Sequence, residues 1–534
     1  MIGYCGTGYH GMQVNPPQKT IEGDLFEAFV KAGCVSKDNA VDQKKVSFMR
    51  AARTDKGVHA AGNVVSLKLI VEDDKVVERI NSHLPETIRV WGINRTNKSF
   101  ECRKMCDSRV YEYLIPSYSF LPPSPSSHLS ERIKLASEEH PGVTRADPEG
   151  AQFWETYYAA VKEAGFNEED VIKAFEEATK AEVEANLKAK AKKAAEAAEA
   201  TAAANAWAAE TAAIRAAAAA QTPAAIRAAA EAAEAAKTLA TDASVAEAPV
   251  AEASVVDAPV QLPIVEVLVV QPPSIEALVE TVVEDKSADQ ESISNRPVSS
   301  LKQIKIIGNK IRREYRISPE RLELLREAFC VYEGSHNFHN FTIGKDFRDP
   351  SALRHMKSLT VSEPFLIEGT EWLSIKIHGQ SFMLHQIRKM VAMVALVIRA
   401  GCPLERINEA FNQTRINIPK APSLGLLLEQ PVYKGYNSKL ETFGYTPVDF
   451  EAWKDQIQAF KMKHIYDKIY YEEAKENVFH GFFAFIDSFN GDPIFDFITA
   501  RGITERTNVS NRRQPKLAID DDNDDEIAAS DNEG

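Results

Sequence analysis

A change of composition in the middle of the chain limits how much of the sequence can build a folded core. Between about Ser137 and Pro297 the sequence becomes rich in alanine, as in AKAKKAAEAAEATAAANAWAAE, and then scatters prolines among small apolar residues. Alanine favours a helix but offers little side chain to bury, and proline interrupts a long helix. We therefore expect residues 135–300 to form an insert of exposed helix or disordered chain, and expect the rest to fold without residues 137–297.

Two stretches with globular patterning flank this insert, residues 1–134 and 301–465. In the first, TIEGDLFEAFVKAG has helical spacing after the capping residue Thr20, whereas ETIRVWGINRT and SRVYEYLIP are typical of strands. In the second, WLSIKIHG predicts a strand and SFMLHQIRKMVAMVALVIRAG a helix. The mixture predicts an α+β fold with a mixed, largely antiparallel sheet flanked by helices. We expect residues 466–505 to dock on this body and 506–534 to be an acidic disordered tail.

The net charge of −14 hides a basic body. Residues 1–134 contain 19 basic and 15 acidic residues, and residues 301–465 contain 24 and 17. Such a body is compatible with a nucleic-acid partner, because phosphate groups are neutralised by lysine and arginine. The sequence has no run of eighteen apolar residues, so we expect no membrane partner. Its six cysteines lack a C-x-x-C pair, which indicates a reduced intracellular protein.

A single carboxylate, Asp55, stands in a loop of unusual composition, RAARTDKGVHAAGNVVSLKL. The loop precedes a run with the two-residue period of a strand, so Asp55 is expected at the mouth of a sheet. Its neighbours Arg53, Lys56 and His59 favour the ionised form, which would suit a nucleophile better than a proton donor. The alternative is an aspartate that caps a turn and pairs with Arg53 for structure alone, and the residues around Asp55 by themselves leave both interpretations open.

Two pairs of potential metal ligands have the wrong surroundings for a metal site. Cys102 and Cys106 are close in sequence, and His336 and His339 are spaced i, i+3, but neither pair has further ligands nearby. We predict no metal at either pair. The two histidines are expected to pack within their loop or to contact phosphate.

The octamer RTDKGVHA closely resembles the catalytic loop of the TruA family of tRNA pseudouridine synthases, whose signature is R-x-D-x-G-V-H-A. GYCGTGYHGMQ before the loop and GSHNFHNFT after it also resemble blocks of that family. The resemblance covers roughly residues 1–120 and 300–465. It implies two pseudo-symmetric halves that share the sheet, with a catalytic cleft between them.

The resemblance also implies roles for five residues. Asp55 would be the nucleophile and Arg53 would help to push the target uridine out of its stack. Tyr111 would lie over the base, Arg388 would pair with Asp55, and Leu424 would line the pocket. From the residues alone, Tyr111 and Leu424 can equally be core residues, and Arg388 can be an arginine whose charged end reaches solvent.

The expected function is conversion of uridine to pseudouridine in tRNA, with snRNA and mRNA as further candidates, by base flipping and attack by Asp55 without a cofactor. Attack on the ring and abstraction of a sugar proton are both open as first steps. Two alternatives are an RNA-binding chaperone that folds tRNA without chemistry and a hydrolase that excises the base. We expect a monomer in the nucleus, with the mitochondrion and cytoplasm as alternatives. The start resembles a point within the family's first strand, so we expect a truncated or alternative start and a targeting segment missing from this end.

Overall fold

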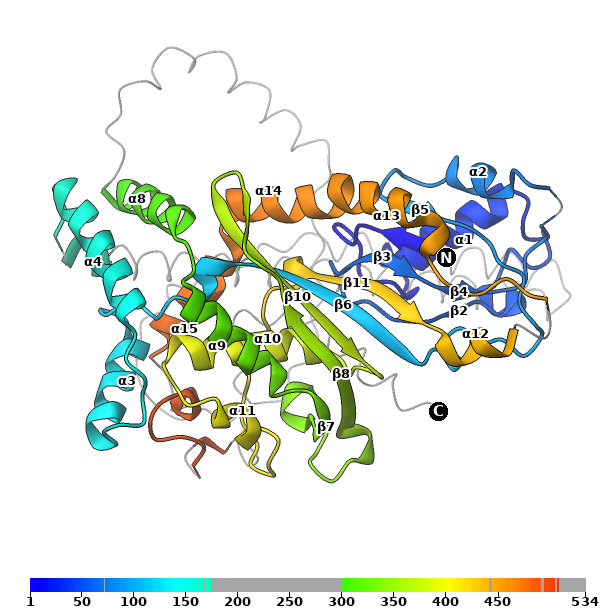
Figure 1. Ribbon diagram of the computed structural model, residues 1–534. Helices are drawn as coiled ribbons and strands as arrows, with labels where there is room; N and C mark the ends of the chain where they lie inside the picture. Colours follow the sequence, from blue (N-terminus) through cyan, green and yellow to red (C-terminus); the bar gives the residue numbers. More distant parts are fainter. Residues whose placement is uncertain are drawn as a thin grey trace, which may run out of the picture. The chain divides into compact units, whose positions relative to one another are not determined.

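The computed structural model describes residues 1–71, 73–167, 169–173, 188, 300–440, 444–490, 494–504 and 507–508. One compact unit comprises Met1–Lys180 with Ser300–Gly534, and a second comprises Ala181–Ser299. All the strands and helices named below lie in the described part of the first unit (Figure 1). The predictions for the alanine- and proline-rich residues 189–299 and for the tail from residue 509 lie outside the described residues.

A mixed nine-stranded sheet forms the centre of the first unit. In spatial order its strands are β5 (Ile88–Val90), β1 (Ile2–Tyr4), β3 (His59–Asn63), β11 (Leu426–Val432), β6 (Ser108–Pro116), β10 (Thr370–Gly379), β8 (Leu353–Val361) and β7 (Gly334–Asn337), with β9 (Phe365–Ile367) paired to β10. Among these strands every pair is antiparallel except β3 with β11. A separate ribbon pairs β2 (Met49–Arg50) with β4 (Val65–Ser66). The predicted mixed, largely antiparallel sheet is confirmed.

The two stretches of globular sequence interlock within this sheet. Strand β11, which comes from the second stretch, lies between β3 and β6 of the first, and β6 in turn pairs with β10 of the second. Tyr111 on β6 is therefore opposite Leu428 on one side and Ile377 on the other. Neither stretch can complete its part of the sheet without a strand from the other, so the two halves form one body.

Helices cover the sheet on both faces. In the described part of the chain they are α1 (Ile21–Lys31), α2 (Val76–Asn81), α3 (His128–Glu139), α4 (Pro148–Glu163), α8 (Ser300–Glu314), α9 (Pro319–Cys330), α10 (Gln386–Arg399), α11 (Glu405–Glu409), α12 (Lys434–Leu440), α13 (Lys454–Phe460), α14 (Asp467–Glu476) and α15 (Val478–Ser488). Helix α1 begins as predicted, because the Thr20 side chain accepts a hydrogen bond from the Gly23 amide. No described helix is both long and apolar enough to cross a bilayer.

Helix α10 is the central helix of the body. Every one of its residues is buried, and it packs against α9 and α11. The opposite face of the sheet is covered by α13 and α14, which are joined by the π-helical turn Lys461–Tyr466. Lys461 in that turn donates to Glu112 on β6 at 3.0 Å and also to Glu429 on β11. Because side chains alternate along a strand, Glu112 and its neighbour Tyr111 point to opposite faces.

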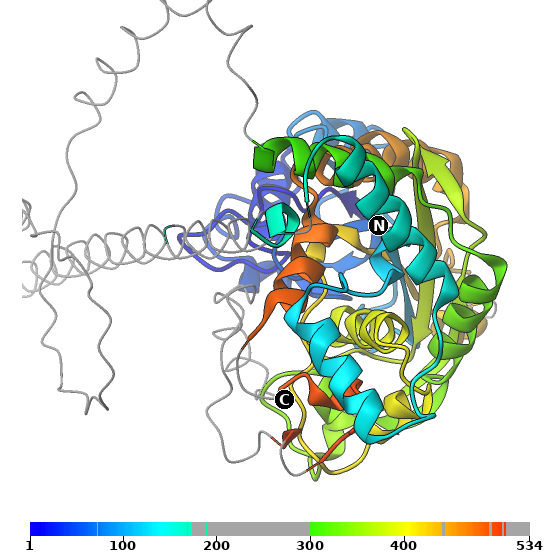
Figure 2. The same ribbon diagram turned by 90° about the vertical axis from the view of Figure 1, so that its left-hand side faces the viewer.

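The expected start of the insert at residue 135 is too early. That position lies inside α3, which packs against α15, and α4 packs against α8. Figure 2 shows α3, in cyan, and α4, in teal, lying against the body. Aromatic residues explain why the folded body extends beyond residue 135. Phe153 and Tyr157 on α4 supply the large buried side chains that an alanine-rich segment lacks.

Ion pairs also hold α4 on the body. Arg321 on α9 is 6% exposed and binds Asp147 at 2.5 Å and Glu149 at 2.8 Å, and Glu149 also accepts from Ser318 Oγ at 2.7 Å. Asp147 caps α4 by accepting from the Gly150 amide. Residues 147–149 are thus part of the folded body.

Candidate active site

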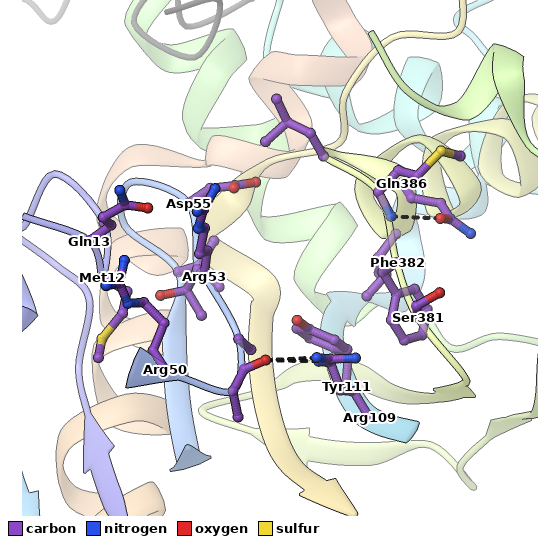
Figure 3. Close-up of a pocket in the computed structure, with 18 of the residues that line it drawn as sticks. Met12, Gln13, Arg50, Arg53, Asp55, Arg109, Tyr111, Ser381, Phe382 and Gln386 are labelled. Carbon is purple, nitrogen blue, oxygen red and sulfur yellow. Dashed lines mark hydrogen bonds between the residues drawn. The ribbon is translucent and has the colours of Figure 1, made fainter. Parts of the chain in front are cut away.

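A cleft of about 670 Å³ opens at the place where the two stretches of sequence meet. One wall comes from the loops around Met12 and Asp55, and the other from the segment Gln380–Ile387 ahead of and within α10. Strand β6 contributes Arg109 and Tyr111. Figure 3 shows Asp55 and Arg53 on one side of the cleft and Tyr111, Phe382 and Gln386 on the other. The volume is within the range of small-molecule pockets, so it can hold a nucleoside.

The loop that carries Asp55 is held closely against the segment around Gly11. The Met12 amide donates to the Thr54 carbonyl at 3.1 Å, and the Val58 amide donates to the Asp55 carbonyl at 3.1 Å. Gly11 has φ +88°, and a Cβ there would lie 2.8 Å from the Thr54 carbonyl oxygen. Only glycine combines that backbone conformation with such a close approach, which accounts for Gly11 in GYHGMQ.

The carboxylate of Asp55 is mostly buried and is bound by a histidine. Its side chain is 18% exposed, and its Oδ2 lies 3.2 Å from Nδ1 of His385, whose side chain is fully buried. Burial by itself would raise the pKa of Asp55. The hydrogen bond and charge of His385, followed by the charges of Arg388 and Lys420, outweigh burial and lower this pKa below its usual value. Asp55 is therefore ionised at neutral pH.

Arg388 acts on Asp55 through its charge. It lies in the first turn of α10, is 5% exposed, and its Nε donates to the Ala421 carbonyl at 2.6 Å. In the described part of the chain, the Asp55 carboxylate is hydrogen-bonded to His385, three residues before Arg388. Burial excludes the alternative in which the guanidinium reaches solvent.

Two tyrosines of β6 share one face but have different surroundings. The Tyr113 hydroxyl donates to the Pro422 carbonyl at 2.7 Å within the core. Tyr111 lines the cleft, where its ring meets the Phe382 ring edge-on, with centroids 5.1 Å apart. Arg109 Nη2 donates to the Ala51 carbonyl at 2.7 Å and Nη1 to the Gln380 carbonyl at 3.4 Å, so Arg109 connects the two walls.

The remaining predicted residues fall in different places. Arg53 lines the cleft beside Asp55. Leu424 is buried in the turn ahead of β11 and is not among the residues that line the cleft, whereas Leu426 is. His59 is buried, and its Nδ1 accepts from the Gly6 amide at 3.1 Å. Burial lowers the pKa of His59 to about 4, so this histidine is neutral and fixes the loop.

The histidine pair, expected to pack within its loop or to contact phosphate, makes aromatic contacts, and the ring on which His336 stacks lies outside the loop. His336 stacks on Phe411 with centroids 4.3 Å apart, and His339 is buried against Phe347. In the described part of the chain no three His, Cys, Asp or Glu side chains are grouped as a metal site requires.

Sequence reasoning underestimated the segment before α10. His385 and Phe382 contribute to the cleft, and neither was assigned a role. The available signal was His385 itself, a polar residue directly after the apolar run Phe382–Leu384, but its contact with a residue 330 positions away cannot be inferred from the linear sequence.

Comparison with known proteins identifies the class of this fold and cleft. Residues 328–434 match the family model described as tRNA pseudouridine synthase. The chain is 47% identical over 542 aligned residues to tRNA pseudouridine synthase 1 of Yarrowia lipolytica, a match that covers all of this chain and 83% of that protein. It is 44% identical to tRNA pseudouridine synthase 1 of Saccharomyces cerevisiae, covering 96% and 79% of the two chains. It is 32% identical to the tRNA pseudouridine(27/28) synthase of the same yeast, covering 90% and 96%.

These identities extend over nearly the whole chain and most of each relative. The chain belongs to the tRNA pseudouridine synthase family.

Proposed function

We propose that this chain converts uridine to pseudouridine in tRNA, with Asp55 as the reacting carboxylate. The observation that carries the proposal is the ionised Asp55 in a cleft that also presents the ring of Tyr111. A buried carboxylate cannot reach a base inside a stem, so the target nucleotide has to be flipped out of its stack. The names of the relatives support tRNA as the substrate.

Each part of the cleft has a task in this reaction. The Tyr111 ring supplies a face on which a flipped uracil can stack, which is worth about 1–3 kcal/mol per base. Arg53, which lines the cleft beside Asp55, would help to push the uridine out of its stack. Further arginines along the cleft, Arg103 and Arg354, offer positive charge to the RNA backbone.

The reaction needs no cofactor, because substrate and product have the same atoms. The bond from the sugar C1′ to N1 of uracil breaks, the uracil rotates, and a new bond forms from C1′ to C5. The proton that leaves C5 is balanced by the proton that N1 gains. Asp55 can begin the reaction by attacking the ring or by removing a sugar proton. Both routes require the ionised carboxylate.

A chaperone that binds and folds tRNA without chemistry is the second candidate. The basic body would suit it, but binding does not require a carboxylate to be kept ionised in a partly buried position, where charge is costly. Other structured RNAs, a nuclear location and a monomeric state stay predictions.

The Asp55→Asn variant tests the proposal. It should form no pseudouridine in a tRNA transcript, while its Kd for that transcript stays near the wild-type value, because phosphate contacts supply the affinity. Asp74→Asn, at an exposed position outside the cleft, is the matched control. Wild-type turnover in Asp55→Asn would refute the role of Asp55. Free uracil among the wild-type products would favour a base-excising hydrolase.

A further inference from the structure

His385 has an unusual backbone conformation. It is the residue immediately before α10, and its φ of +60° lies in the left-handed region, which non-glycine side chains rarely adopt. Such a conformation persists only where the surroundings fix it, and it is often found at functional sites. The identity and contacts of this residue therefore call for an explanation beyond the start of a helix.

The contacts of His385 link the two walls of the cleft. Its carbonyl accepts from the Lys389 amide at 3.0 Å, which begins the hydrogen-bond ladder of α10. Its ring, on the other side, reaches across to Asp55, with 3.2 Å between Nδ1 and Oδ2. The segment before it is held in place as well, because the Met383 amide donates to Gln386 Oε1 at 2.9 Å. The strained residue thus aims its ring at the carboxylate from a rigid support.

We infer that His385 is a positioning residue for the proposed reaction: its Nδ1–H holds Oδ2 of Asp55 and leaves Oδ1 as the oxygen that reacts. The inference rests on the proposed role of Asp55. In the described part of the chain, this carboxylate is hydrogen-bonded through Oδ2. A carboxylate fixed through one oxygen keeps the other at a defined place, which is what attack on a bound base requires.

The chemistry of imidazole fixes where the proton lies. If Nδ1 carried a lone pair, it would face the lone pairs of a carboxylate, so Nδ1 must carry hydrogen whether His385 is neutral or charged. Among the described residues, the charged or titratable groups that act on Asp55 besides His385 include Arg388 on α10, Lys420 in the loop before β11 and Tyr111 on β6. Of these, Arg388 and Lys420 lower the pKa of Asp55 together with His385.

Two variants separate the hydrogen bond from the ring. Asn tolerates the left-handed conformation and can place an amide N–H near the position of Nδ1, so His385→Asn keeps the donor and cannot titrate. His385→Phe keeps a ring of similar size and removes the donor. His378→Phe is the matched control, because that histidine also makes one side-chain hydrogen bond, to Ser108 at 2.9 Å, and does not line the cleft.

The measurements are the single-turnover rate of pseudouridine formation across pH and the Kd for the same tRNA. Removing a donor to Asp55 raises the pKa of that carboxyl, and only the ionised form reacts. The acidic limb of the rate profile should therefore move to higher pH in His385→Phe, and should move less in His385→Asn, which keeps the hydrogen bond but not the charge. At neutral pH His385→Phe should react about 10- to 100-fold more slowly, the factor that a hydrogen bond to a charged group contributes. The Kd should change little in both variants.

Three results would overturn the inference or separate it from the proposed function. A wild-type rate with an unshifted acidic limb in His385→Phe would overturn it. Equal losses in both variants with unshifted limbs would make the role of His385 structural only, which also overturns it. If His385→Phe fails to fold, His385→Gly, which relieves the left-handed strain, must show the same shift of the limb. Activity in Asp55→Asn would instead refute the proposed function itself.

Discussion

Replacing Arg321 by Met should destabilise the body strongly, because it removes the positive charge that holds α4. The arginine is 6% exposed, and Asp147 and Glu149 are 26% and 21% exposed. Its Nη1 also donates to the Phe120 carbonyl at 2.6 Å. Met fills a similar volume, so the loss comes from the charge and the hydrogen bonds rather than from a cavity.

The size of the effect follows from what remains buried. Removing one partner of a buried ion pair costs about 3–5 kcal/mol, because the other charge is left without compensation. Some water reaches both carboxylates, which places the expected loss at the lower end, about 3 kcal/mol. Ser318 and Tyr315 still donate to Glu149, so the carboxylate keeps part of its hydrogen bonding.

The dependence on pH gives a second check. Burial would raise the pKa of Glu149, but hydrogen bonds from Tyr315 and Arg321 and the charge of Arg321 lower it overall. A carboxyl with a lowered pKa in the fold stabilises the protein above its unfolded pKa, about 4.3, and loses that contribution as pH falls through the folded pKa. The difference between wild type and Arg321→Met should therefore shrink below about pH 4.

The assay is urea unfolding of the full chain followed by circular dichroism. The matched control is Arg326→Met on the same helix, whose ion pairs to Glu323 and Glu363 are exposed to solvent and should matter little. Equal urea midpoints for the two variants would refute the reasoning. They would indicate that α4 contributes little to the stability of the body, as the composition of the insert predicts. The same ion pairs imply that deleting residues 137–297 would leave Arg321 without its partners.

Three further predictions concern single side chains. Arg388→Met should slow pseudouridine formation most at low pH and recover partly as pH rises, because loss of that charge raises the pKa of Asp55; a flat profile at wild-type rate would contradict the assignment. Tyr111→Ala should lower kcat/KM by about 10- to 100-fold through lost stacking, whereas Tyr111→Phe should keep most activity; equal losses would show that the hydroxyl is what matters. Burial raises the pKa of Glu473 to about 7, so the wild type should lose about 3 kcal/mol of unfolding free energy between pH 4 and pH 8, a slope that Glu473→Gln should lack.

Local features of the fold could be predicted because their causes are local. Thr20 and the apolar spacing after it specify α1, and the apolar run after His385 specifies α10. The predicted helix nevertheless began too early, at Ser381. The structure begins α10 at Gln386, because residues before it line the cleft and His385 takes a left-handed conformation.

Long-range features could not be read from the sequence. The parallel pairing of β11 with β3 joins Leu427 to His59, and no pattern within either strand specifies the other. The aromatic residues of α4 indicate local packing, but the sequence does not specify that α4 packs against α8. At the site, the motif around Asp55 predicted the carboxylate and its charge state, whereas the partner that touches it had to come from the fold.

The position of β11 has a consequence for biosynthesis. The slot between β3 and β6 stays empty until Leu426 has left the ribosome, 310 residues after β6 ends at Pro116. At roughly 5–20 residues per second, that interval lasts about 15–60 s. During it the nascent chain has two unpaired strand edges, which are sites of aggregation and of chaperone binding. An mRNA on which translation stalls before Leu426 should yield insoluble chains, even though the loop that carries Asp55 has already been synthesised.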